Sequence, residues 1–131
     1  MIGIAVVAHA GLATELCRAA ELILGPLSAV ASVSIDRQTS VKHARDELEQ
    51  TIERVGAAGK GVLILTDMFG GTPTNLSAEF LQPGRVEILC GVNLPLLIKA
   101  VSERSNQELA QLAPFLRDYT RSAIVLPTDL F

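Results

Sequence analysis

Two side chains of reactive type each follow an apolar segment in this chain. His9 comes after the apolar run at residues 2–8, and Asp67 comes after another at residues 61–66. A free imidazole titrates with a pKa of about 6.5, so near neutral pH it can act as a nucleophile, a general base or a metal ligand. A carboxylate that accepts the N–H of one ring nitrogen leaves the lone pair of the other available for chemistry. The pair is therefore a candidate catalytic site.

The segment after Asp67 has the composition of a phosphate-accepting loop. It contains Gly70, Gly71 and Thr72 ahead of Pro73. Glycines allow backbone N–H groups to approach a ligand closely, and the N-terminus of a helix carries partial positive charge. The threonine adds a hydroxyl donor. Because neither the loop after His9 nor this one contains lysine or arginine, the pattern favours transient phosphoryl transfer over tight phosphate binding.

Strand and helix patterns alternate along the chain and position these residues. Apolar or alternating runs predict strands at residues 2–8, 28–35, 61–66, 86–90 and 122–126. Helical spacing predicts helices at residues 12–24 and 41–55. Three more helices are predicted: one that begins with Thr72 as its N-cap, one from about Pro95 to about Glu103, and one from Asn106 to about Arg121. Pro114 is expected to kink or divide the last of these. Asn93 is either a helix cap or a phosphate contact.

This alternation predicts an α/β fold. Strands joined by helices imply right-handed crossovers, a mostly parallel, doubly wound sheet and three α/β/α layers in one domain over residues 1–131. If the strand order is 2-1-3-4, the first and third strands are neighbours where the order reverses. Ligands in such sheets bind beyond the carboxyl ends of the strands at that point. His9 and Asp67 would then face one another across one crevice.

Composition excludes several classes of function. The net charge is -3 and the chain has no tryptophan, which argues against a nucleic-acid partner. The apolar N-terminus lacks a basic leader and a cleavage site, and no apolar run approaches the roughly 20 residues that span a bilayer, so a cytoplasmic protein is expected. Cys17 and Cys90 form no paired motif and are expected to be small, buried hydrophobic side chains.

Three segments together resemble a known family. They are Val7-Ala8-His9-Ala10-Gly11-Leu12-Ala13, then Leu65-Thr66-Asp67-Met68-Phe69-Gly70-Gly71-Thr72-Pro73-Thr74-Asn75, and finally Gly91-Val92-Asn93-Leu94-Pro95-Leu96-Leu97. In this order they are similar to the enzyme IIA domain of the mannose-type bacterial phosphoenolpyruvate-dependent sugar phosphotransferase system. The resemblance extends over essentially the whole chain.

The resemblance implies a phosphohistidine relay. His9 would accept a phosphoryl group on Nε2 from the histidine-containing phosphocarrier protein and pass it to a IIB domain, while Asp67 holds the ring. Thr66, Gly70, Gly71 and Thr72 would lie near the phosphoryl group. No metal or cofactor is implied. The family also implies a homodimer in which residues 122–126 form a strand exchanged with the partner, and association with a membrane permease complex.

The sequence is also compatible with other functions. A two-component receiver domain would use Asp67 as the phosphoryl acceptor, but it needs an acidic pair where Ala8 and His9 stand. The phosphocarrier subunit of a dihydroxyacetone kinase has a related fold and the same histidine chemistry. Because the sequence stops at Phe131 without a linker or IIB domain, a regulatory module without a dedicated transporter is also compatible.

Overall fold

The computed structural model describes residues 1–131 and contains one parallel four-stranded sheet with the order β2-β1-β3-β4. The strands are β1 (Gly3–His9), β2 (Val30–Ile35), β3 (Val62–Thr66) and β4 (Val86–Cys90). The predicted strand order is confirmed, and β1 and β3 are neighbours at the point where the order reverses.

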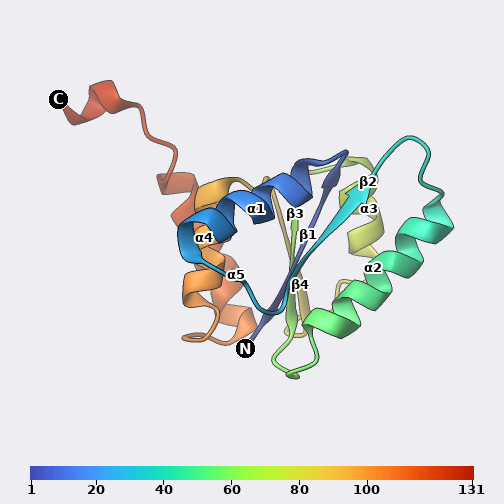
Figure 1. Cartoon of the computed structure of the whole chain (residues 1–131). Helices are drawn as coiled ribbons and strands as arrows, with labels where there is room; N and C mark the ends of the chain where they lie inside the picture. Colours follow the sequence, from blue (N-terminus) through green and yellow to red (C-terminus); the bar gives the residue numbers. More distant parts are fainter.

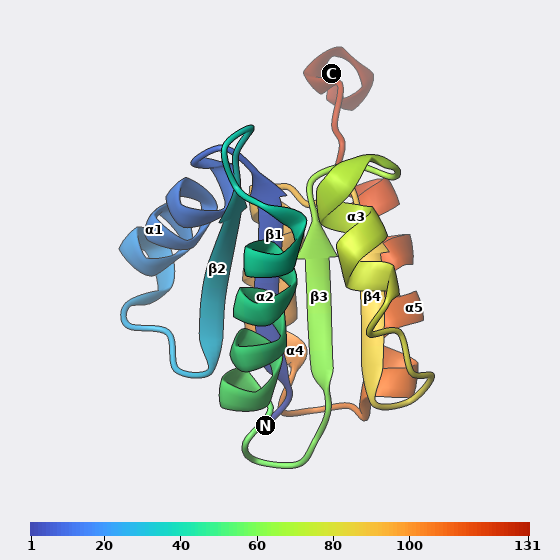
Figure 2. The ribbon, with the colours of Figure 1, turned by 90° about the vertical axis from the view of Figure 1, so that its right-hand side faces the viewer.

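Helices cover both faces of the sheet (Figures 1 and 2). On one face lie α1 (Leu12–Leu24), α4 (Leu94–Glu103) and α5 (Leu109–Ser122). On the other lie α2 (Val41–Val55) and α3 (Gly71–Ala78). The three predicted layers are therefore confirmed.

The central strand β1 is apolar because both of its faces are buried. Ile4, Val6 and Ala8 belong to the core under α1, α4 and α5. Ala5 and Val7 belong to the second core, under α2 and α3. Since successive side chains of a strand point to opposite faces, this continuous apolar run is what a strand between two helical layers requires.

Side-chain caps begin two helices where the sequence offers them. Ser40 accepts a hydrogen bond from the N–H of His43 at the start of α2, and Asn93 accepts one from the N–H of Leu96 at the start of α4. Each bond satisfies a backbone donor that has no partner within the helix. Asn93 is thus a helix cap.

Two predicted helix starts are wrong. Helix α3 begins at Gly71 with Gly70 as its N-cap, so Thr72 is already inside the first turn. Gly70 and Gly71 make the turn into the helix with φ angles of +89° and +79°, which glycine tolerates, so the hydroxyl of Thr72 is not used as a cap. The N-cap position of α5 is Glu108 rather than Asn106, whose amide donates to Glu103 instead. Pro114 lies within α5 without dividing it.

The predicted last strand at residues 122–126 is not formed. Helix α5 continues through Ser122, and the chain then runs without strand pairing to a short 3-10 helix at Pro127–Leu130. Ile124, Val125 and Leu126 are exposed, and this tail projects from the molecule (Figure 1). Apolar, β-branched residues suit a strand, but a strand also needs a neighbouring edge, and this tail has none.

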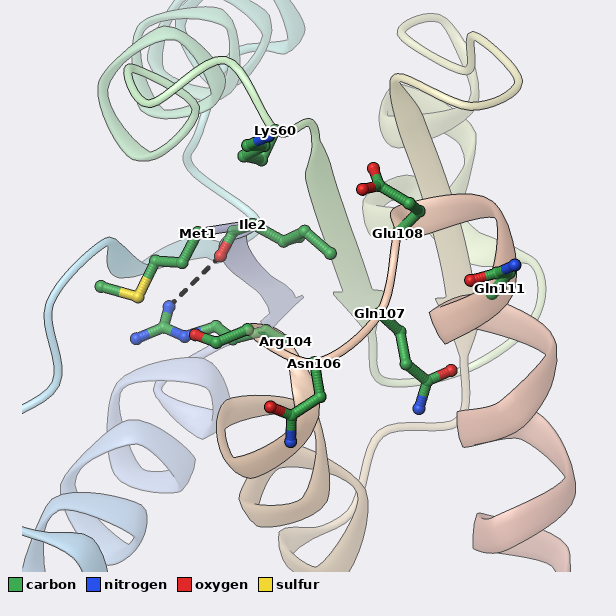
Figure 3. A pocket seen from close by; sticks show the side chains of 9 residues that line it. Met1, Ile2, Lys60, Arg104, Asn106, Gln107, Glu108 and Gln111 are labelled. Carbon is green, nitrogen blue, oxygen red and sulfur yellow. Dashed lines mark hydrogen bonds between the residues drawn. The ribbon is translucent and has the colours of Figure 1, made fainter.

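A buried arginine joins three segments at the amino ends of the strands. Arg104 is 5% exposed, and its guanidinium donates to the carbonyl of Ser28 at 2.7 Å, of Ala29 at 3.2 Å and of Ile2 at 3.4 Å. Figure 3 shows the contact with Ile2 beside Met1. Burial lowers the pKa of Arg104 from its ordinary value. These bonds tie the end of α4 to the start of β1 and to the turn before β2.

The expected burial of both cysteines is wrong: Cys17 is half-buried, and Cys90, at the end of the edge strand β4, is exposed.

None of the helices combines the length and the apolar composition needed to cross a membrane.

Candidate active site

His9 and Asp67 are in direct contact, as the strand order predicts. His9 is the last residue of β1, and Asp67 follows β3. The ring nitrogen Nδ1 of His9 lies 2.7 Å from Oδ2 of Asp67, and the backbone N–H of His9 donates to the same oxygen at 2.9 Å. Because an ionised carboxylate only accepts hydrogen bonds, Nδ1 carries the proton of the neutral ring. The lone pair is therefore on Nε2.

The surroundings of Asp67 keep its carboxylate charged. Burial raises the pKa of Asp67, but hydrogen bonds from the backbone N–H and the ring of His9 outweigh that effect, and the pKa lies below its ordinary value. Its side chain is 10% exposed, against 48% for His9. The second oxygen, Oδ1, is buried without a hydrogen-bond partner. The negative charge is thus held behind a ring that faces solvent.

The first turn of α3 lies against the imidazole. A Cβ atom placed on Gly71 would be 3.2 Å from Cε1 and 3.4 Å from Nε2 of His9. Gly71 also has the positive φ noted above, which a larger residue rarely adopts. A glycine at this position lets the backbone of the helix N-terminus approach the reactive nitrogen. Gly70 has open space around it and supplies the turn.

Thr72 and Thr66 have different positions relative to this ring. Thr72 lines the same cavity as His9. Thr66 is fully buried, and its hydroxyl is 2.8 Å from that of Thr74, which in turn bonds to the carbonyl of Met68. Thr66 does not line the cavity, so its placement favours support of the loop over the predicted contact with a phosphoryl group.

The cavity beside His9 has a volume of about 350 Å³ and includes residues that were not among the predicted site residues. Its lining is His9, Ala10, Ile35, Asp36, Arg37 and Thr72. Asp36 and Arg37 follow β2, whose last residue Ile35 is in register with His9. The strand order 2-1-3-4 indicates that these residues lie near His9, because it places the end of the second strand beside the end of the first.

A cavity of similar size, about 360 Å³, lies around Arg104 at the other end of the strands (Figure 3). It contains no histidine or cysteine, and it is not at the carboxyl ends of the strands, where ligands bind in such sheets. No group of three or more histidine, cysteine, aspartate or glutamate side chains is arranged to hold a metal ion. The His9 cavity is the candidate active site because it holds the imidazole that Asp67 orients, at the carboxyl ends of the strands.

Comparison with known proteins decides the family. The family model described as the PTS system fructose IIA component, of the mannose type, matches residues 3–116. The chain belongs to the mannose-type IIA family of the phosphotransferase system (PTS). Membership gives this IIA protein a role in sugar phosphotransferase systems, and the receiver-domain alternative no longer applies.

Curated relatives of this IIA protein agree with that assignment. It is 30% identical to the sorbose-specific EIIA component of Lacticaseibacillus casei over 114 residues, which cover 86% of this chain and 81% of the relative. It is 27% identical to the fructose-specific EIIA component of Bacillus subtilis, covering 86% and 77%. It also matches the mannose-specific EIIAB component of Escherichia coli at 26% identity, but covers only 36% of that longer protein.

Solved structures share the fold over nearly the full chain. The EIIA component from Streptococcus agalactiae superimposes with a TM-score of 0.87 at 28% identity, covering 98% of this chain and 99% of that one. The mannose/sorbose-specific IIA subunit from Enterococcus faecalis gives a TM-score of 0.82 at 26% identity, with coverage of 95% and 93%. The predicted three-layer fold is thus that of PTS IIA proteins.

Proposed function

We propose that residues 1–131 form one cytoplasmic phosphoryl-transfer domain in which His9 accepts a phosphoryl group from the histidine-containing phosphocarrier protein. A IIB component then takes the group from His9 for carbohydrate uptake. The observation that carries this proposal is the 2.7 Å contact between Nδ1 of His9 and Asp67, which leaves Nε2 unprotonated beside an open cavity.

The transfer step follows from this geometry. The lone pair of Nε2 attacks the phosphorus atom of the donor's phosphohistidine, and the P–N bond of the donor breaks as the new P–N bond forms. The electron pair of the broken bond returns to the donor's imidazole. The positive charge that develops on the His9 ring is balanced by Asp67. In the transfer to a IIB component, phosphorylated His9 is the donor: its P–N bond breaks as the acceptor forms a new bond to phosphorus.

The start of α3 supplies donors for the phosphoryl oxygens. The N–H groups of Gly71 and Thr72 have no intrahelical acceptor, because they belong to the first turn of a helix. Together with the hydroxyl of Thr72 and the partial positive charge of the helix end, they suit an anion next to Nε2.

Phosphorylation of His9 is directly testable. After incubation with phosphoenolpyruvate, enzyme I and the phosphocarrier, the protein is expected to carry one acid-labile phosphoryl group, which mass spectrometry locates on His9. His9→Ala should remain unlabelled, whereas His43→Ala, which removes the other histidine, should be labelled like the wild type. Equal labelling of the His9 variant would refute the proposal.

A second part of the same experiment identifies the protein that accepts the phosphoryl group from His9. Transfer from the labelled protein to a IIB domain supports a role in sugar uptake. Transfer only to dihydroxyacetone kinase subunits would instead support the kinase alternative. A label that is retained in the presence of both acceptors would favour a regulatory module.

We further propose that the protein is a homodimer that exchanges the segment after α5. Ile124, Val125 and Leu126 expose apolar surface that a second copy could cover. Light scattering at micromolar concentration is expected to give about twice the chain mass of 13.9 kDa. Deletion of residues 123–131 should reduce the mass to that of a monomer. A monomeric wild-type protein would contradict this proposal.

A further inference from the structure

Arg37 is a cationic side chain that lines the same cavity as His9. The end of β2 holds it there, because Ile35 is in register with His9 and accepts a hydrogen bond from the N–H of Ala10 at 3.0 Å. The segment that follows Ile35 must therefore start beside the imidazole. Arg37 is exposed, so its guanidinium is accessible to a group that enters the cavity.

Arg37 also has no ion-pair partner within the protein. Arg18, Arg45 and Arg117 each contact a carboxylate within 3.1 Å, and the guanidinium of Arg104 is used by backbone carbonyls. None of the ion pairs of the structure includes Arg37. Its donors are thus free for an anion from outside the chain.

The charges around His9 show why such a cation is needed. A phosphoryl group on Nε2 carries about two negative charges. The carboxylate of Asp36 lines the same cavity, and the carboxylate of Asp67 lies behind the ring. Both repel a phosphoryl group, and Arg37 is the cationic side chain that lines the cavity with them. A guanidinium presents paired N–H donors whose spacing matches two phosphate oxygens.

We propose that Arg37 binds the phosphoryl oxygens while the group is being transferred to and held on Nε2 of His9. The inference rests on the proposed function and deepens it by adding a phosphoryl-binding side chain from the loop after β2. The cavity of about 350 Å³ has roughly ten times the volume per molecule of liquid water, so it has room for the phosphoryl group beside the guanidinium. In the transition state of transfer, the negative charge is spread over the three equatorial oxygens of the phosphoryl group, which the guanidinium would contact.

The test compares Arg37→Gln and Arg37→Lys with Arg54→Gln. Arg54 is a matched control, because it is also exposed and outside any ion pair, in the last turn of α2 and remote from the cavity. Phosphorylation by the phosphorylated carrier is measured as kcat and KM, and the product is examined by phosphorus NMR. We expect Arg37→Gln to lower kcat by about 10–100-fold, as for loss of a charge-assisted hydrogen bond, and to shift the phosphohistidine resonance. Arg37→Lys should keep a higher kcat than Arg37→Gln, because lysine preserves the positive charge.

The outcomes separate this inference from the proposed function. A wild-type protein that is not labelled on His9 refutes the proposed function itself. A labelled wild type with kcat and resonance unchanged in Arg37→Gln, as in Arg54→Gln, overturns the role of Arg37 alone. An increase in KM with unchanged kcat also overturns it, because Arg37 would then only help to dock the donor protein.

Discussion

Asp67→Asn is expected to slow phosphorylation of His9 by about 10²–10⁴-fold without unfolding the protein. The amide is similar in size to the carboxylate, so the packing around it is preserved. However, its oxygen, which still faces the backbone N–H of His9, is a weaker acceptor for the Nδ1 proton than a carboxylate oxygen, so the ring tautomer that places the lone pair on Nε2 is held less firmly. The neutral amide also cannot balance the positive charge that develops on the ring.

The rate is measured by rapid mixing with phosphorylated carrier, and circular dichroism verifies the fold. Asp36→Asn is the matched control, because Asp36 also lines the cavity but does not contact the ring nitrogens. It is expected to transfer at least as fast as the wild type, since it removes a charge that repels phosphate. Identical kinetics for Asp67→Asn and the wild type would remove Asp67 from the mechanism.

Gly3→Ala is expected to lower the free energy of unfolding by about 3 kcal/mol or more. A Cβ on Gly3 would lie 2.2 Å from the carbonyl oxygen and 2.5 Å from the carbonyl carbon of Val55. These are backbone atoms at the end of α2, so the clash cannot be relieved by rotating a side chain. The helix or the central strand would have to move.

Urea denaturation measures this loss, with Gly11→Ala as the matched substitution. Gly11 has a φ of −87° and open space where a Cβ would be placed, so its replacement should cost less than about 1 kcal/mol. If Gly3→Ala were as stable as Gly11→Ala, the close approach of α2 to the start of β1 would not be a constraint on the fold.

The sequence predicts the fold and the central pair of the site because both follow from simple patterns. Continuous apolar runs identify the central strands β1 and β3, alternating or mixed runs identify β2 and β4, and the handedness of the connections restricts the strand order. Once β1 and β3 are neighbours, the last residue of β1 and the residue that follows β3 lie side by side. His9 and Asp67 could therefore be paired without knowledge of any side-chain position.

Other features depend on three-dimensional detail that local patterns do not contain. Thr66 and Thr72 look equivalent in the sequence, yet strand register turns Thr66 into the protein interior, toward Thr74. Arg37 does not stand out in the sequence, because it follows β2, which carries no reactive residue of its own. The segment after α5 has the composition of a strand, but composition does not supply a neighbouring edge to pair with.

The common direction of the strands has a practical consequence for attaching this protein to a surface. Met1 lies at the end of the sheet opposite His9, whereas the tail that ends at Phe131 emerges from the same end as the site (Figure 2). A tether joined to the N-terminus would therefore leave the phosphorylation site facing outward, accessible to large protein partners. Immobilisation through the C-terminus would instead place the support next to the cavity.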